Sequence, residues 1–195
     1  KQTMDLEQKS IERIRMASEM SLHYYGKPLI CTYSGGKDSD VMLELFLRSG
    51  VPFEAENSHT TVDAPPTVYH IRRRFRKLEE QGIKCHVHMP QMTMWQLIVK
   101  KKMPPTRLCR YCCSYFKENN TKNRFVATGV RWAESGRRKN RQEIEPKSKK
   151  LSEQIMIMND NDRNRALTER CELNADMIVN PILDWNDTDI WEYYW

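Results

Sequence analysis

Short apolar runs alternate with amphipathic stretches along most of this chain, and this alternation restricts its fold more than any other feature. The apolar runs have strand length, and in the stretches between them apolar residues recur every three or four positions, as on one face of a helix. Strands that alternate with helices form βαβ units, which build a parallel sheet. The sequence therefore predicts an α/β fold with a doubly wound, mainly parallel sheet and helices on both faces.

The bounds of the elements follow from this periodicity, from glycines that end helices and from prolines that begin them. The polar stretch 133–153 is expected to be a mobile loop, and Asn186 or Asp187 is expected to cap the last helix. The expected helices cover residues 5–25, 39–48, 66–81, 93–102, 112–119 and 188–195. The expected strands cover residues 29–33, 53–57, 83–88, 124–130, 154–158 and 177–182.

The length of 195 residues suits a single domain over residues 1–195. Because the chain stops within an amphipathic run, Glu192–Trp195, we expect a C-terminal tail that is missing from this sequence. No run of about 18 apolar residues is present, and the N-terminus lacks the apolar core of a secretory signal. We therefore expect a cytoplasmic protein that does not enter a membrane. Its net charge of +6 suits a polyanionic ligand.

A glycine-containing turn with the sequence SGGKDS lies between the expected strand 29–33 and the expected helix 39–48. Glycines let backbone N–H groups approach a phosphate, and a helix N-terminus adds partial positive charge. Lys37 can reach a phosphate oxygen, and Asp38 can help to hold Mg²⁺. The spacing of a Walker loop is absent. The residues that we expect to bind phosphate here are Ser34, Gly35, Gly36, Lys37, Asp38 and Ser39.

This turn resembles the S-G-G-x-D-S signature of the PP-loop ATP pyrophosphatase superfamily. Three further segments resemble those of the PAPS reductases: TTVDAPPT at 60–67, GVRWAESGRR at 129–138, and NPILDW with a following DIW at 180–191. On these motifs, which span residues 29–195, the chain is identified as a member of the PAPS reductase-like family. The resemblance implies an adenine nucleotide α-hydrolase-like fold, an adenine nucleotide as ligand and Mg²⁺ bound with ATP.

The resemblance also implies which residues act on the nucleotide. Catalytic roles are expected for Lys37, Asp38 and Arg131, because guanidinium and ammonium groups suit phosphate and sulfate oxygens. Asp184 and Trp185 also lie in a segment that resembles the family, but a structural corner explains them equally well. Further contacts to nucleotide or phosphate are expected from Thr61, Asp63, Gly129, Arg131, Ser135 and Arg138.

Two adjacent cysteines, Cys112 and Cys113, resemble the C-C-x-x-x-K segment of the iron–sulfur APS reductases, in which they bind a four-iron cluster together with a later C-x-x-C pair. That later pair is absent from these 195 residues. It could lie in the missing tail, or Cys109, Cys112, Cys113 and Cys171 could supply all four thiolates of a [4Fe-4S] cluster. Zinc on the same thiolates and plain reduced thiols are the remaining alternatives.

Two chemistries remain open. The family resemblance and the paired cysteines favour sulfonucleotide reduction, and an ATP pyrophosphatase is the alternative. In a sulfonucleotide reductase, a cysteine thiolate attacks the sulfur of APS or PAPS, and thioredoxin resolves the product; the family's nucleophile lies in a C-terminal E-C-G-[LI]-H segment that is not present here. In an ATP pyrophosphatase, an oxygen of the substrate attacks the α-phosphate, and sulfur from a donor can then pass to DNA or tRNA. Lys37 is a cation that could pair with the triphosphate of ATP, so its presence in the turn favours ATP binding.

A basic stretch in the expected helix 66–81 raises nucleic acid as a partner. Such charged faces are more often simply solvated, so nucleic acid is not favoured. The sequence does not indicate an oligomeric state. The basic residues of this stretch are Arg72, Arg73, Arg74, Arg76 and Lys77.

Overall fold

A computed structural model describes residues 2–106, 109–118, 121, 123–146 and 176–194 of the chain. Its strands form one six-stranded sheet in the order β3-β2-β1-β4-β6-β5. All neighbouring strands are parallel except β5 and β6, which are antiparallel. The predicted α/β fold with a mainly parallel sheet is therefore confirmed. The strands are β1 (Leu29–Thr32), β2 (Phe53–Ser58), β3 (Cys85–His88), β4 (Phe125–Ala127), β5 (Ile144–Pro146) and β6 (Met177–Val179).

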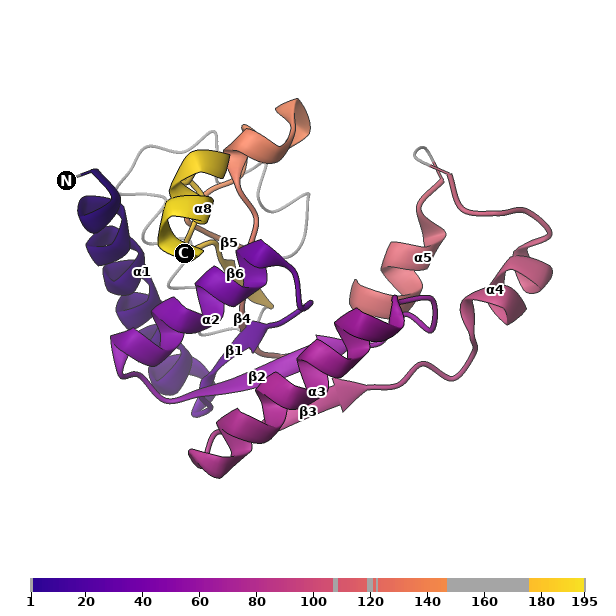
Figure 1. The fold of residues 1–195 in the computed structure, drawn as a ribbon, viewed down its shortest axis with the longest axis horizontal. Helices are drawn as coiled ribbons and strands as arrows, with labels where there is room; N and C mark the ends of the chain where they lie inside the picture. Colours follow the sequence, from indigo (N-terminus) through magenta and orange to yellow (C-terminus); the bar gives the residue numbers. More distant parts are fainter. Residues whose placement is uncertain (1, 107–108, 119–120, 122, 147–175, 195) are drawn as a thin grey trace.

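The helices fall into a main group beside the sheet and a smaller group on a projecting arm. Figure 1 shows α1, α2 and α8 close together, α3 along β2 and β3, and α4 and α5 on the arm. None of the described helices is both long enough and apolar enough to cross a membrane. The α-helices are α1 (Gln2–Tyr25), α2 (Lys37–Ser49), α3 (Pro65–Glu80), α4 (Met94–Lys101), α5 (Tyr111–Cys113) and α8 (Asp187–Tyr194). A π-helical turn, Ser114–Glu118, follows α5, and two 3₁₀ turns cover Trp132–Glu134 and Gly136–Arg138.

The main apolar core lies on the face of the sheet that α1 and α2 cover. Met42 and Phe46 of α2 are fully buried there against Cys31 of β1 and its neighbours. Each side chain of this size contributes about 1.5–3 kcal/mol through burial. Because side chains alternate along a strand, Thr32 and Glu56, which are paired in register, lie on the opposite face. The two faces therefore differ, since the core occupies one and polar residues occupy the carboxyl ends of β1 and β2 on the other.

The prediction of a loop throughout 133–153 is wrong for residues 144–146, which form β5. Two contacts from Asn180 hold this segment beside β6: its backbone N–H donates to Glu143 O (2.8 Å), and its side-chain amide donates to Glu145 Oε1 (2.9 Å). These partners are distant in sequence, so local polarity did not reveal the strand. The strand predicted at 154–158 lies outside the described residues.

Candidate nucleotide-binding site

The order of the strands reverses at β1, because the chain builds β2 and β3 on one side of β1 and β4 and β6 on the other. Parallel sheets bind ligands at such a switch point, outside the carboxyl ends of the strands. A cavity of about 580 Å³ lies there. It is lined by residues at or just after the carboxyl ends of β1, β2 and β4, among them Ser34, Asn57 and Gly129. The fold therefore places a site of nucleotide size where the sequence predicts one.

The turn between β1 and α2 is held by hydrogen bonds of its own. Gly36 N–H donates to Ser39 Oγ (3.1 Å), and Ser39 Oγ donates to Gly36 O (2.8 Å). Ser34 Oγ lies 3.3 Å from Ser39 Oγ. Because Gly36 caps the helix, α2 begins at Lys37, two residues before the predicted start at Ser39. The first backbone N–H groups of α2, which lack partners within the helix, therefore lie at the cavity.

Gly35 fits this turn for two separate reasons. Its φ of +75° is one that side chains larger than hydrogen rarely allow. A Cβ atom at this position would lie 2.8 Å from Cγ1 of Ile71 in α3 and 3.2 Å from Cγ2 of Thr67. The turn therefore packs directly against α3, and a glycine is required for that approach.

Two cations and two carboxylates form an ion-pair network beside the turn. Asp187 Oδ1 lies 2.9 Å from both Lys37 Nζ and Arg131 Nη2, and Asp38 pairs with the same two cations at 3.2 Å. The guanidinium of Arg131 is buried, and it also donates to Trp185 O. Hydrogen bonds from Lys37 and Arg131 lower the pKa of Asp187 below its usual range. The fold thus brings together all three residues predicted to be catalytic.

Asp187 itself is a member of this network that the sequence analysis did not assign to the site. It was considered only as a cap of the last helix. Of the two predicted caps, Asn186 caps the helix, because its Oδ1 accepts from Asp189 N–H (3.0 Å). Because Asp187 is 150 residues from Lys37, no local signal in the sequence indicated their contact.

Arg138 brings a guanidinium group to the wall of the cavity. It lines the cavity and forms an ion pair with Glu134. Partial burial lowers the pKa of Arg138, and so do the nearby charges of Arg141, Arg110 and Arg131. Several guanidinium groups near one cavity wall favour an anion such as phosphate or sulfate.

The remaining predicted residues divide between the cavity wall and its supports. Thr61 does not line the cavity, and its Oγ1 accepts from Met94 N–H (2.8 Å) at the start of α4. Ser135 is exposed. Gly35, Gly36, Lys37 and Arg131 lie in the turn and the ion-pair network rather than on the wall itself. The predicted residues on the wall are Ser34, Asp38, Ser39, Asp63, Gly129 and Arg138.

Asp184 and Trp185 have structural roles. Arg13 of α1 is almost completely buried and donates to both carboxylate oxygens of Asp184, and Lys9 lies 2.6 Å from Asp184. Trp185 is fully buried, and its indole N–H donates to Ser10 Oγ (2.9 Å). These contacts fix α1 to the segment that precedes α8, which carries Asp187.

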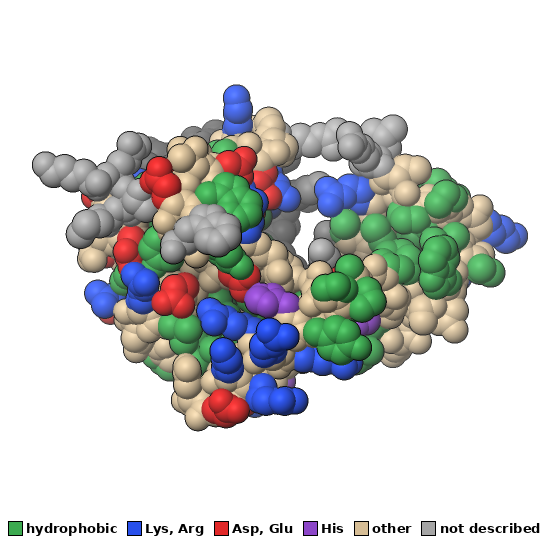
Figure 2. Space-filling view, viewed as in Figure 1, with side chains coloured by type: hydrophobic (Ala, Val, Ile, Leu, Met, Phe, Trp, Pro, Cys, Tyr) green, Lys and Arg blue, Asp and Glu red, His purple; other side chains and the backbone are tan. Residues whose placement is uncertain are grey.

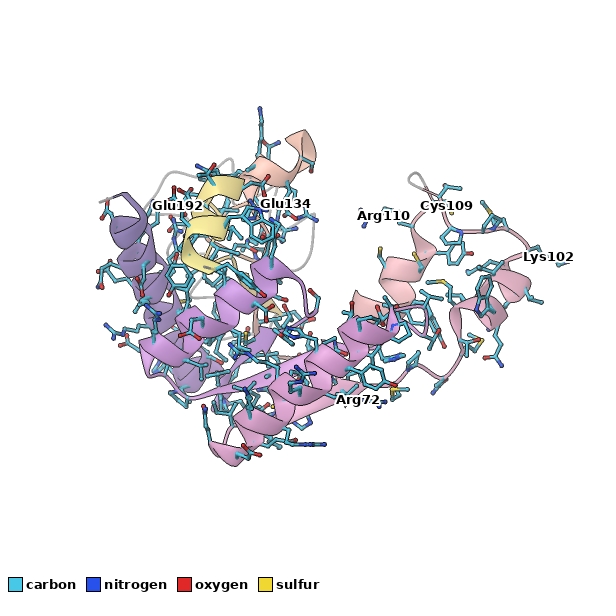
Figure 3. The ribbon with its side chains drawn as sticks, viewed as in Figure 1. Arg72, Lys102, Cys109, Arg110, Glu134 and Glu192 are labelled. Carbon is cyan, nitrogen blue, oxygen red and sulfur yellow. The ribbon has the colours of Figure 1, made fainter. Side chains whose placement is uncertain are left out.

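The cysteines predicted to bind a metal lie on the arm. Figure 3 shows Cys109 and Arg110 on the segment that carries α5, whereas Glu134 lies beside α8. Cys112 and Cys113 are half-buried, and partial burial together with Cys113 raises the pKa of Cys112. Among the described residues, no group of three or more His, Cys, Asp or Glu side chains could hold a metal ion. Cys171 lies outside the described residues.

The basic stretch predicted in the helix 66–81 lies on α3. Figure 2 shows Lys and Arg side chains gathered over the lower middle of the view, where α3 lies in Figure 1. Arg74 forms an ion pair with Glu44 (3.6 Å). The exposed members are Arg72, Arg73, Arg76 and Lys77.

The fold and the site together define an α/β domain with a phosphate loop at the switch point of its sheet. The family model of the phosphoadenosine phosphosulfate reductase domain matches residues 28–195. The chain therefore belongs to this family, which is part of the PP-loop ATP pyrophosphatase superfamily. No curated protein matches the chain.

Solved structures share the fold at low sequence identity. FMN adenylyltransferase from Candida glabrata in complex with FMN and the ATP analog AMPCPP has a TM-score of 0.53 at 12% identity, over 98% of this chain and 56% of that chain. The same enzyme with FAD and inorganic pyrophosphate has a TM-score of 0.54 at 13% identity, over 98% and 55%.

A third similar structure is the U34-tRNA thiolase NcsA from Methanococcus maripaludis with its [4Fe-4S] cluster. It has a TM-score of 0.50 at 17% identity, over 93% of this chain and 63% of that chain. The present chain spans less than two thirds of the length of each of these proteins. At these identities the likeness concerns the fold.

Proposed function

We propose that this chain binds ATP with its phosphates at the turn 34–39 and promotes attack on the α-phosphate. An oxygen of an acceptor forms a bond to the α-phosphorus, and the bond from that phosphorus to the oxygen bridging to the β-phosphate breaks. Pyrophosphate leaves with the electron pair, and the acceptor becomes adenylated. Nucleophilic sulfur from a donor would then form a bond to the activated atom of DNA or tRNA, and AMP would leave with the acceptor oxygen.

The observation that carries the proposal is the composition of the cavity wall. The wall combines the phosphate-binding turn with Arg138, and none of its described residues is a cysteine. A reductase needs a thiolate at the sulfate sulfur, whereas attack at phosphorus needs mainly positioning and positive charge. The described part of the chain therefore supplies what attack at phosphorus needs.

Lys37 and Arg131 act as the cations of the site in this proposal. A phosphate at the turn would accept hydrogen bonds from them, in competition with the exposed carboxylate of Asp187. Asp38 lines the cavity and offers the carboxylate oxygen that Mg²⁺ prefers, so it would contact Mg²⁺ that arrives with ATP. Mg²⁺ would neutralise charge on the departing pyrophosphate.

The test is nucleotide binding and turnover by the full-length protein. Calorimetry should show binding of Mg²⁺–ATP, and turnover in ¹⁸O-labelled water, with water as acceptor, should place the label in AMP. Lys37→Ala should weaken ATP binding about 10- to 100-fold, the usual effect of losing a charged hydrogen bond. Lys139→Ala serves as the matched control, because Lys139 is exposed and does not line the cavity.

Sulfonucleotide reduction is the second candidate, and the match to the phosphoadenosine phosphosulfate reductase domain favours it. APS and PAPS belong in the same experiment for this reason. Binding of either one with release of sulfite, in the presence of reduced thioredoxin and without binding of ATP, would reject the ATP proposal. Oxidoreductase activity would then require a nucleophilic cysteine outside the cavity wall described above.

We propose in addition that Cys112 and Cys113 supply two thiolates to an iron–sulfur cluster. Their adjacent positions and partial exposure support this role, since clusters are held by cysteine thiolates. The described residues provide too few converging ligands, so the remaining thiolates would come from other parts of the protein. The tRNA thiolase of similar fold was solved with such a cluster.

A further inference from the structure

We infer that the projecting arm, which carries α4 and α5, binds a single-stranded segment of nucleic acid. Bases of this segment stack on Trp95, and its phosphates pair with the lysines at the end of α4. The inference rests on the proposed function in one respect, because that function requires DNA or tRNA as the acceptor. It goes further by naming the surface that holds the acceptor, which is separate from the nucleotide cavity.

The net charge of the chain is concentrated in the stretch 89–117, to which the arm belongs. This stretch contains six Lys or Arg residues and no Asp or Glu. The whole chain has 32 basic and 26 acidic residues, so the residues outside the stretch carry 26 of each sign. Lys100 and Lys101 suit the negative end of α4, but that effect does not explain why so long a stretch has no acidic residue. By charge, the stretch matches a polyanion.

The outer face of α4 carries large apolar side chains. Trp95 is 70% exposed and Val99 is 77% exposed, and they lie one turn apart on the face opposite Leu97, the buried residue of this helix. Met89 and Met103 are exposed as well. Figure 2 shows hydrophobic side chains gathered over the arm at the right of the view. A grouped apolar surface marks an interaction site, and an exposed aromatic ring among cations is what nucleic-acid bases stack on.

Hydrogen bonds hold this surface in a defined shape. Met94 N–H, at the start of α4, donates to Thr61 Oγ1 (2.8 Å). Tyr111 Oη donates to Met103 O (2.6 Å), which ties α5 to the segment after α4. Lys101 Nζ lies 6.0 Å from the centre of the Tyr111 ring. A surface that is ordered before binding loses less conformational entropy when a ligand arrives.

The cations of the arm continue toward the nucleotide cavity. Figure 3 shows Lys102 at the end of α4 and Arg110 beside α5. Partial burial lowers the pKa of Arg138 on the cavity wall, and the charges of Arg141 and Arg110 lower it further. Arg110 therefore acts electrostatically on the cavity wall, and a strand bound along the arm is directed to the site of adenylation. The exposed cations of the arm are Lys100, Lys101, Lys102 and Arg110.

A single strand fits these features better than other partners do. A second copy of this chain would bring the same uncompensated cations against the surface, so charge opposes a homodimer there. A duplex keeps the faces of its bases stacked inside, whereas a single strand or an RNA loop offers them to an aromatic ring. An acidic protein would satisfy the lysines without needing the indole of Trp95, and the test below separates it from nucleic acid.

The test is fluorescence anisotropy of the full-length protein, without ATP, on a labelled 20-nucleotide DNA strand, the RNA of the same sequence and the DNA duplex. We expect the tighter of the two single strands to bind at least fivefold more tightly than the duplex, and its identity to distinguish DNA from RNA as the acceptor. Trp95→Ala should weaken that binding about 5- to 100-fold, the usual effect of losing one stacked base, and Trp95→Phe should restore most of it. Trp132→Ala is the matched control, because Trp132 is exposed but lies outside the arm.

The salt dependence tests the lysines separately. Replacing Lys100 and Lys101 by alanine should reduce the slope of log Kd against log salt concentration by about 1.4, since each contact to a phosphate of a single strand contributes about 0.7. Replacing Lys27 and Lys84 removes the same charge from exposed positions that precede β1 and β3, and it should leave the slope unchanged. Equal changes in both double variants would overturn the inference.

The wild-type protein gives a decision even if a variant fails to fold. Binding of poly-glutamate of equal charge as tightly as the single strand would assign the surface to an acidic partner and overturn the inference. Absence of oligonucleotide binding in protein that still binds ATP would overturn this inference alone. Selective binding of the single strand by protein that does not bind ATP would support the surface and reject the proposed function.

Discussion

Replacing Gly35 by alanine is the most direct test of how the turn 34–39 is built. Alanine at φ +75° costs about 1–2 kcal/mol, because its Cβ approaches the following carbonyl oxygen. The new Cβ would also lie 2.8 Å from Ile71 Cγ1 and 3.2 Å from Thr67 Cγ2. Overpacking of this kind costs a further 1–3 kcal/mol or so. The expected total is about 2–5 kcal/mol, a large share of the about 5–15 kcal/mol that stabilises a typical domain.

Urea unfolding of the two variants Gly35→Ala and Gly50→Ala separates these contributions. Gly50 has a similar φ of +70°, but no atom lies within 4 Å of a Cβ built there. Gly50→Ala should therefore lose only the backbone cost of about 1–2 kcal/mol. If both variants lose the same free energy of unfolding within about 0.5 kcal/mol, the argument that α3 approaches the turn too closely for a side chain is refuted.

Three further predictions concern the supports of the site and the cysteines. Arg13→Ala should destabilise the protein by about 3–5 kcal/mol in chemical unfolding, because it removes the buried guanidinium and leaves Asp184 with only exposed Lys9 as an ion-pair partner among the described residues. Lys9→Ala should cost under about 1 kcal/mol, and equal losses would contradict this. Burial alone would raise the pKa of Asp184, but hydrogen bonds from Arg13 and Lys9 lower it. The contribution of ionised Asp184 to the free energy of unfolding is therefore complete above the ordinary pKa of about 3.9, and it is lost as the pH falls through the lowered pKa. Asp184→Asn should remove that part of the pH dependence of stability, and an unchanged acid profile would argue against it. Full-length protein purified without oxygen should contain iron, and Cys112→Ser should remove it. Cys31→Ser is the control and should retain the iron, because Cys31 is buried. Iron-free wild-type protein would reject the cluster.

The ion-pair network gives Asp187 a part that its position in the sequence does not suggest. It bridges Lys37 and Arg131 from the first turn of α8, and α8 is held in place by the fully buried side chains of Trp185 and Ile190. A change in the packing of α8 would therefore change the ion pairs of Lys37 and Arg131 with Asp187. α8 and the turn 34–39 are structurally linked in this way, although Lys37 and Asp187 are 150 residues apart in the chain.

The sequence by itself determined the fold class and the place of the turn 34–39. Both depend on local patterns: apolar periodicity distinguishes strands from helices, and the turn 34–39 carries its glycines, serines and cation within six residues. The sequence also named Arg131 and Arg138 as candidates from the segment 129–138, and the structure places Arg131 in the ion-pair network and Arg138 on the cavity wall. Local order is sufficient for such features, since neighbours in the chain remain neighbours in the structure.

Tertiary structure alone decided which distant groups meet. It joined Asp187 to Lys37, brought Glu56 onto the cavity wall beside His88, and paired residues 144–146 with β6. Each of these contacts depends on how strands are ordered in the sheet and how α8 packs on α1 and α2, which no short segment encodes. The turn could be predicted from six consecutive residues, but the ion-pair partners of Lys37 and the other residues of the cavity wall come from separate strands and helices, so they are brought together only when the sheet assembles.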